Sequence, residues 1–126
     1  MRSYIDSDVL IWHLRGEHKA AKCLRQLEAS GAELWVGALQ RAEIVFFMRP
    51  EEAEPTAHLL SRFKTAPITA EVVDDAGALY RQWNPSHGVD VNDAMLAATV
   101  MKTGGRIFTL NTKHYPMPDL VVGKAW

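Results

Sequence analysis

The sequence contains very little cysteine, since Cys23 is the only one in 126 residues. A lone cysteine excludes an intrachain disulfide and favours a reducing, intracellular setting. Cys23 itself is interpreted as a small buried helix residue. Long apolar runs are also missing, because no stretch approaches the roughly 18 apolar residues that a membrane-spanning helix needs. We therefore expect a cytoplasmic protein with no membrane partner.

No signal peptide is expected either, because Asp6 and Asp8 interrupt the first apolar run. The chain has no internal repeat, low-complexity tract or interdomain linker. The formal net charge is only −1, so a nucleic acid would have to bind through a local patch. The hydrophobic fraction of 48% and the charged fraction of 23% are ordinary for a globular protein. The length predicts one domain over residues 1–126.

Short apolar runs alternate with helical patterns along the chain. The sequence predicts strands over residues 2–6, 33–36, 66–68, 106–109 and 120–122. It predicts helices over residues 8–15, 18–29, 38–48, 70–83 and 91–102, with a loop over 84–88. A further helix is expected to run to about Phe63, with either Pro50 or Pro55 in its first turn. This alternation predicts an α/β fold, with a parallel sheet of four or five strands and helices on both faces.

Three acidic residues fall where such a sheet would bring them together. Asp6 ends the first strand, Glu43 lies inside the helix after the second, and Asp93 opens the helix before the fourth. Ligands of parallel sheets bind beyond the carboxyl ends of the strands. Each acid also has a structural interpretation: Asp6 as a helix N-cap, Glu43 as a solvated face residue, and Asp93 as a first-turn acid.

Clustered carboxylates form a hard oxygen site suited to Mg²⁺ or Mn²⁺. Such an ion lowers the pKa of bound water and neutralises charge on phosphate oxygens, which fits the hydrolysis of a phosphodiester. Without a metal ion the carboxylates would repel one another and a polyanionic substrate. We therefore expect the metal-free protein to be a poor nuclease.

Four motifs resemble the PIN domain family. They are YIDSDVLIW at the start, RAEI after the second strand, DAMLAATV after a loop, and TLNTKHYPMPDL near the end. They occur in the order of the family, and the resemblance extends in particular to the VapC-type ribonuclease toxins of bacterial toxin–antitoxin pairs. It implies a PIN-like three-layer α/β/α sandwich and a Mg²⁺- or Mn²⁺-dependent endoribonuclease. It also implies a homodimer, an RNA substrate and inhibition by a VapB-like antitoxin.

Carried over by position, the resemblance implies that Asp6 and Asp93 are metal ligands. It implies that Glu43 binds the metal or orients the attacking water. The family often has a fourth acid where this chain has Asn111. Since an amide adds no charge, this difference puts a second tightly held metal in question.

Several nearby residues are additional candidates. Asp90 could supply the missing charge, although an N-cap role is favoured for it. Asp8 is interpreted as a cap or as a support for a metal ligand. Lys113 and His114 are interpreted as loop residues, with contact to RNA phosphates as the alternative. The run Phe46-Phe47-Met48 is interpreted as core, with a dimer or antitoxin groove as the alternative.

Two other functions stay open from the sequence. A haloacid-dehalogenase-type phosphatase also has an acidic DxD motif after its first strand, with Asp6 as nucleophile and Asp8 as general acid/base. That interpretation gives Glu43 no role. The acidic signature of those phosphatases has a glycine directly followed by an aspartate, whereas Val89 separates Gly88 from Asp90 here. A catalytically degenerate PIN-like module that binds RNA or a partner is the second alternative, and Asn111 motivates it.

Overall fold

A five-stranded parallel sheet forms the middle of the computed structural model, which describes residues 1–126. Its strands are β1 (Arg2–Ile5), β2 (Glu33–Gly37), β3 (Lys64–Ala66), β4 (Arg106–Thr109) and β5 (Val122–Lys124). The strand order is β3-β2-β1-β4-β5, so β1 is central and pairs with β2 and β4. The predicted α/β fold with a parallel sheet of four or five strands is confirmed.

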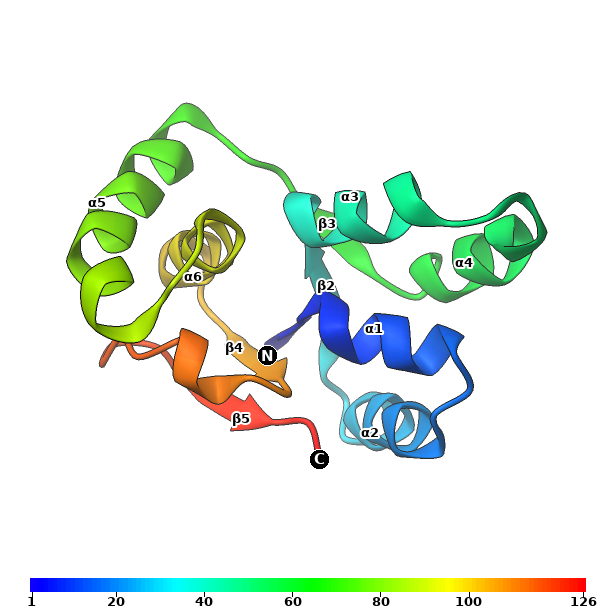
Figure 1. Ribbon diagram of the computed structural model, residues 1–126. Helices are drawn as coiled ribbons and strands as arrows, with labels where there is room; N and C mark the ends of the chain where they lie inside the picture. Colours follow the sequence, from blue (N-terminus) through cyan, green and yellow to red (C-terminus); the bar gives the residue numbers. More distant parts are fainter.

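Helices cover both faces of this sheet (Figure 1). They are α1 (Ser7–Leu14), α2 (His18–Ala29), α3 (Ala38–Phe47), α4 (Ala53–Leu60), α5 (Ala70–His87) and α6 (Val91–Thr103), with two 3₁₀ turns, η1 (Pro50–Glu52) and η2 (Thr112–His114). Helices α5 and α6 lie on one side of the sheet, and α1 to α4 lie on the other. The predicted three-layer sandwich is therefore present. No helix combines the length and apolarity needed to cross a membrane.

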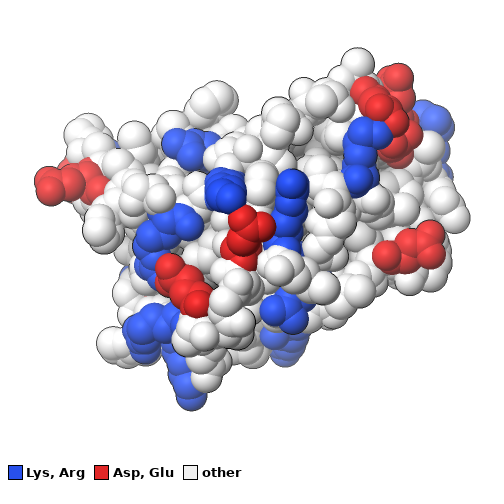
Figure 2. Space-filling view, turned by 180° about the vertical axis from the view of Figure 1, so that it is seen from behind, with Lys and Arg blue, Asp and Glu red and all other residues white.

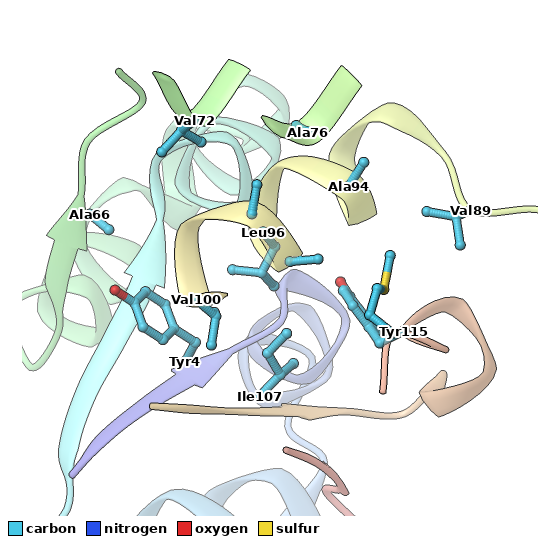
Figure 3. Close-up of a cluster of buried hydrophobic side chains, with 13 residues drawn as sticks. Tyr4, Ala66, Val72, Ala76, Val89, Ala94, Leu96, Val100, Ile107 and Tyr115 are labelled. Carbon is cyan, nitrogen blue, oxygen red and sulfur yellow. The ribbon is translucent and has the colours of Figure 1, made fainter. Parts of the chain in front are cut away.

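Strand β1 contributes side chains to two separate cores. Tyr4 packs in the core that contains Leu96 of α6 (Figure 3), whereas Ile5 packs in the core that contains Leu10 of α1 and Leu24 of α2. Neighbouring residues of a strand point to opposite faces of the sheet, and each of these five side chains is buried. The two cores thereby fix β1, and with it the position of the residue that follows, Asp6.

The predicted loop over residues 84–88 is wrong, because α5 continues to His87. Pro85 lies inside the last turns of this helix, where a proline removes one backbone hydrogen bond without ending the helix outright. The helix ends at Gly88, whose φ of 66° is the left-handed conformation that glycine adopts at low cost. The Asn84 amide donates to the Val89 carbonyl at 3.1 Å and closes this end. Gly88, and not Pro85, therefore ends helix α5.

Three other predicted boundaries shift by a few residues. Strand β3 ends at Ala66, before Pro67, because proline has no N–H to donate to a ladder. Strand β5 begins at Val122, two residues after the predicted start. The helix expected to begin near Pro50 or Pro55 and to run to about Phe63 spans Ala53–Leu60, and Pro50 opens the 3₁₀ turn that precedes it.

The face seen from behind Figure 1 carries charges of both signs. Figure 2 shows lysine and arginine side chains interspersed with aspartate and glutamate on this side. Exposed ion pairs of the chain include Lys64 with Glu33 at 2.7 Å, and Arg62 with Glu28. Such exposed pairs contribute little to stability. The mixed pattern agrees with the small net charge and does not form an extended basic surface.

Candidate active site

Asp6 lies at the carboxyl end of the central strand and is the N-cap of α1. Its Oδ1 accepts the Ser7 amide at 2.8 Å. Its Oδ2 accepts the Tyr115 hydroxyl at 2.7 Å and the Thr109 hydroxyl at 3.0 Å. Burial raises the pKa of Asp6, as does the charge of Asp8, and these three hydrogen bonds oppose the rise. The N-cap interpretation of Asp6 is therefore confirmed, and the same side chain lies at the sheet edge where a site is predicted.

Asp8 stands in the first turn of α1 and connects that helix to the end of β4. Its Oδ2 accepts the Leu110 amide at 3.1 Å, and the Thr109 hydroxyl lies 3.2 Å from the same oxygen. Its Oδ1 accepts the Val9 amide at 2.7 Å. These contacts agree with the predicted supporting role, since Asp8 fixes the segment whose threonine holds Asp6.

Helix α3 brings a glutamine and a glutamate to the same cavity. Gln40 and Glu43 are three residues apart and so lie on one helix face. Gln40 is only 2% exposed, and its amide donates to the Asn92 carbonyl at 3.3 Å. Gly37 precedes the helix, and a Cβ there would collide with the Gln40 side chain. This glycine therefore makes room for the buried amide.

Glu43 is half-buried and faces other carboxylates. Desolvation raises its pKa, the charges of Asp6, Asp90 and Asp8 raise it further, and a hydrogen bond with the Ser7 side chain opposes the rise. The solvated-face interpretation of Glu43 is therefore wrong. Its carboxyl group lies in the field of the other acids, where a cation would be stabilised.

Asp90 and Asp93 form a capping box at the start of α6. The Asp93 amide donates to Asp90 Oδ1 at 2.8 Å, and the Asp90 amide donates to Asp93 Oδ2 at 3.3 Å. The predicted N-cap role of Asp90 is thus confirmed. Burial is the main cause that raises the pKa of Asp93 to about 7, while the backbone hydrogen bond from Asp90 opposes the rise.

Asn111 and His114 close the cavity from the segment after β4. The Asn111 side-chain nitrogen lies 3.0 Å from His114 Nδ1, and that ring nitrogen lies 3.2 Å from Asp93 Oδ2. His114 therefore borders the site, although the sequence favoured an ordinary loop residue. Lys113 is exposed and is not part of the cavity lining.

Every site residue predicted from the sequence lines a single cavity of about 240 Å³ that has no hydrophobic lining residue. The lining residues are Asp6, Ser7, Asp8, Gln40, Glu43, Asp90, Asn92, Asp93, Asn111 and His114. They come from the carboxyl ends of β1 and β4 and from the starts or inner faces of α1, α3 and α6. This is the sheet edge at which the sequence placed a site.

The donor set of this cavity suits a hard divalent cation, because its acids and amides offer oxygen ligands. No group of three or more His, Cys, Asp or Glu side chains is arranged to hold a metal ion as these side chains stand. Some of their oxygens accept hydrogen bonds within the protein, as Asp6 Oδ2 and Asp90 Oδ1 do. Burial is the main cause that raises the pKa values of Asp6, Glu43 and Asp93, and neighbouring carboxylates raise them further. A cation would offset the repulsion among these carboxylates, and the oxygen-rich lining fits Mg²⁺ or Mn²⁺.

Sequence reasoning missed three residues that hold the site together: Gln40, Thr109 and Tyr115. Gln40 could have been found from its spacing, since it precedes Glu43 by three residues. Thr109 and Tyr115 reach Asp6 across 103 and 109 residues of chain. No local pattern marks such contacts.

The run Phe46-Phe47-Met48 is not core, contrary to the favoured interpretation. Phe46 is 78% exposed and Phe47 is 82% exposed. Phe47 and Met48 line a groove of about 350 Å³ that also includes Glu43, so the groove adjoins the acidic cavity. Arg15 and Arg49 lie along the same groove.

Known proteins are similar to this chain in sequence. The PIN domain family profile matches residues 3–120. Ribonuclease VapC19 of Mycobacterium tuberculosis is 33% identical over 118 residues, which cover 92% of this chain and 94% of the relative. Ribonuclease VapC10 of the same organism is 34% identical over 114 residues, which cover 90% of this chain and 85% of the relative.

Solved structures agree on the fold. A chain of VapBC2 from Rickettsia felis, bound to a DNA fragment from its promoter, matches with a TM-score of 0.83, 16% identity and 98% of both chains covered. A chain of a toxin–antitoxin complex from Klebsiella pneumoniae matches with a TM-score of 0.80, 21% identity and 98% of both chains covered. Sequence and fold together favour the nuclease interpretation over the phosphatase interpretation. This chain belongs to the PIN domain family and, within it, to the VapC-type proteins.

Proposed function

We propose that this protein is a metal-dependent endoribonuclease toxin that cleaves RNA phosphodiester bonds. The observation that carries the proposal is the convergence of Asp6, Glu43 and Asp93, from three separate elements, on one cavity without a hydrophobic lining residue. The VapC relatives are ribonucleases by name, which supports the substrate class. Residues 1–126 would act as a single PIN-like domain.

Asp6 and Asp93 are the residues that would hold Mg²⁺ or Mn²⁺. When bound, such an ion supplies positive charge for the phosphate oxygens and a more acidic water. Glu43 faces the same space and would bind the ion or orient the attacking water. The raised pKa of Glu43 makes it a better proton acceptor than an exposed glutamate.

Asn111 would contribute hydrogen bonds in place of a fourth negative charge. Its amide can donate to a phosphate oxygen or to water, and His114 Nδ1 at 3.0 Å fixes its orientation. Asp90 would add negative charge to the cavity, although its hydrogen bonds belong to the capping box at the start of α6. We infer that one ion is held more tightly than a second.

The proposed partner is a small VapB-like antitoxin. Solved structures with this fold include VapBC complexes, which supports a partner of that kind. Its C-terminal segment would occupy the acidic cavity, with an Arg or Lys facing the carboxylates. The exposed Phe47 and the adjoining groove would receive its apolar side chains. A homodimer is proposed from the family resemblance.

The first test is RNA cleavage by purified, antitoxin-free protein. A structured RNA mixture is incubated with Mg²⁺ or Mn²⁺ and, in parallel, with EDTA. We expect discrete cleavage that needs the metal and that falls at least about 100-fold in Asp6→Asn and in Asp93→Asn, because each removes charge that stabilises the transition state. Asp74→Asn, an exposed acid on α5, is the matched control and should cleave as the wild type does.

Full activity of a folded Asp93→Asn protein would refute the proposed site. Asn111 supports one second candidate, a module that binds RNA without cleaving it. In that case the RNA would be retarded on a gel but stay intact with metal present, and Asp6→Asn would bind it equally well. Full toxicity of the protein when its antitoxin is co-expressed would count against the proposed partner.

A further inference from the structure

We propose that the Tyr115 hydroxyl restricts Asp6 to ligation through one carboxylate oxygen, and that it thereby helps the cavity to select Mg²⁺ over Ca²⁺. Tyr115 is a positioning residue in this proposal, because it acts through Asp6. The inference rests on the proposed function, since it requires Asp6 to hold a divalent cation.

The hydrogen bonds of Asp6 differ between its two oxygens. A carboxylate oxygen can accept about two hydrogen bonds. Oδ2 accepts two, from Tyr115 at 2.7 Å and from Thr109 at 3.0 Å. Oδ1 accepts one, from the Ser7 amide at 2.8 Å. Oδ1 therefore keeps more acceptor capacity for a cation than Oδ2 does.

Thr109 alone would not occupy Oδ2 all the time. Its hydroxyl lies 3.0 Å from Asp6 Oδ2 and 3.2 Å from Asp8 Oδ2. One hydroxyl has one proton and donates to one of these oxygens at a time. The Tyr115 hydroxyl has no such competing acceptor among its hydrogen bonds. Tyr115 is consequently the lasting donor to Oδ2.

Packing holds the Tyr115 hydroxyl in place. The residue is 4% exposed, and its ring belongs to the core that contains Val89, Ala94 and Met117. Figure 3 shows the ring reaching from the segment after η2, with its oxygen turned toward the end of β1. A phenylalanine would keep this packing and remove only the donor.

The number of oxygens that a carboxylate offers affects which ion it binds. Mg²⁺ is small and demands six ligands in near-ideal octahedral geometry, whereas Ca²⁺ accepts six to eight and often takes a carboxylate through both oxygens. An Asp6 held to one oxygen suits Mg²⁺. Freeing Oδ2 would permit two-oxygen ligation, which favours Ca²⁺.

The test is titration calorimetry of metal-free protein with Mg²⁺ and, separately, with Ca²⁺. We expect Tyr115→Phe to lose about tenfold in Mg²⁺ affinity, in the range found for residues that support metal ligands, and to lose less in Ca²⁺ affinity. The ratio of the two affinities should fall at least about threefold. Tyr80→Phe, on the exposed side of α5, is the matched control and should keep the wild-type ratio.

The outcomes separate this inference from the proposed function. A wild-type ratio in folded Tyr115→Phe overturns the inference and leaves the proposed function standing. Equal loss for both ions together with a lowered Tm also overturns it, since that result indicates a merely structural role. Wild-type protein that binds neither ion contradicts the proposed metal dependence itself.

A second variant covers a failure of Tyr115→Phe to fold. Thr109→Val removes the other donor to Oδ2. We expect it to lower the Mg²⁺-to-Ca²⁺ affinity ratio in the same direction, by a smaller factor. An unchanged ratio in that variant would overturn the inference.

Discussion

At the scale of single residues, Asp93 carries an electrostatic cost in the metal-free protein. Its pKa is raised to about 7 in the folded state, against about 3.9 in an unfolded chain. Asp90 and Asp6 face it with negative charge, and His114 lies 3.2 Å away. Between these two pKa values the folded state binds more protons than the unfolded state. The free energy of unfolding therefore falls as the pH rises from about 4 to about 7.

Asp93→Asn should stabilise the metal-free protein at pH 7.5, because it removes a charge that the folded state disfavours. We expect a gain of about 1 kcal/mol or more, which corresponds to a rise in Tm of roughly 3 to 5 °C for a domain of this size. The gain should vanish near pH 4, where the aspartic acid is neutral in the folded protein. Thermal melts in EDTA across this range would check it, with Asp74→Asn as the control. A lower Tm at pH 7.5 would contradict the assigned cause.

At the scale of elements, α6 is the helix that links the site to the core. Its first turn supplies the capping box of Asp90 and Asp93. Its small residues, Ala94, Ala97 and Ala98, are nearly fully buried and permit close packing between the sheet and α5. The start of α6, and so the position of Asp93, is fixed by this packing as well as by the cap.

Helix α5 offers a direct test of the difference between the predicted loop and the observed helix. Pro85 lacks the N–H that would complete the last turns. In a helix, Pro85→Ala restores one backbone hydrogen bond, which stabilises the folded state. The same change makes the unfolded chain more flexible, which opposes this gain. We expect a net rise of about 1 kcal/mol in the free energy of unfolding. Denaturant unfolding would measure the change. If residues 84–88 were a loop in solution, the same variant would leave the stability unchanged or lower it.

At the scale of the whole molecule, the acidic cavity joins elements from both sides of the sheet. Asp6 follows the central strand, Glu43 belongs to α3 on one face, and Asp93 belongs to α6 on the other. A bound cation would therefore connect parts of the fold that metal-free carboxylates push apart. Metal binding is expected to act on global stability and not only on catalysis.

Addition of Mn²⁺ should raise the Tm of the whole domain. Binding to the folded state alone contributes about 2.7 kcal/mol when the ion is at 100 times its Kd. EDTA should reverse the shift, and Asp6→Asn should reduce it strongly. Asp74→Asn should respond as the wild type does. An equal Mn²⁺ shift in wild type and Asp6→Asn would show that the ion binds elsewhere.

The sequence by itself determined the alternation of strands and helices, the parallel sheet and the sheet edge that carries Asp6, Glu43 and Asp93. These features follow from local apolar periodicity and from the rule that parallel strands end together. It also predicted the cap at Asp90, because a capping box spans only four residues.

Only the tertiary structure decided which groups hold the acids and how their pKa values respond. Tyr115 and Thr109 meet Asp6 across more than 100 residues of chain, and His114 of η2 meets Asp93 in the first turn of α6. Burial, which is the main cause of the raised pKa values, exists only after the layers have packed. Local sequence patterns do not predict such contacts, because the contacts depend on how elements far apart in the chain are positioned.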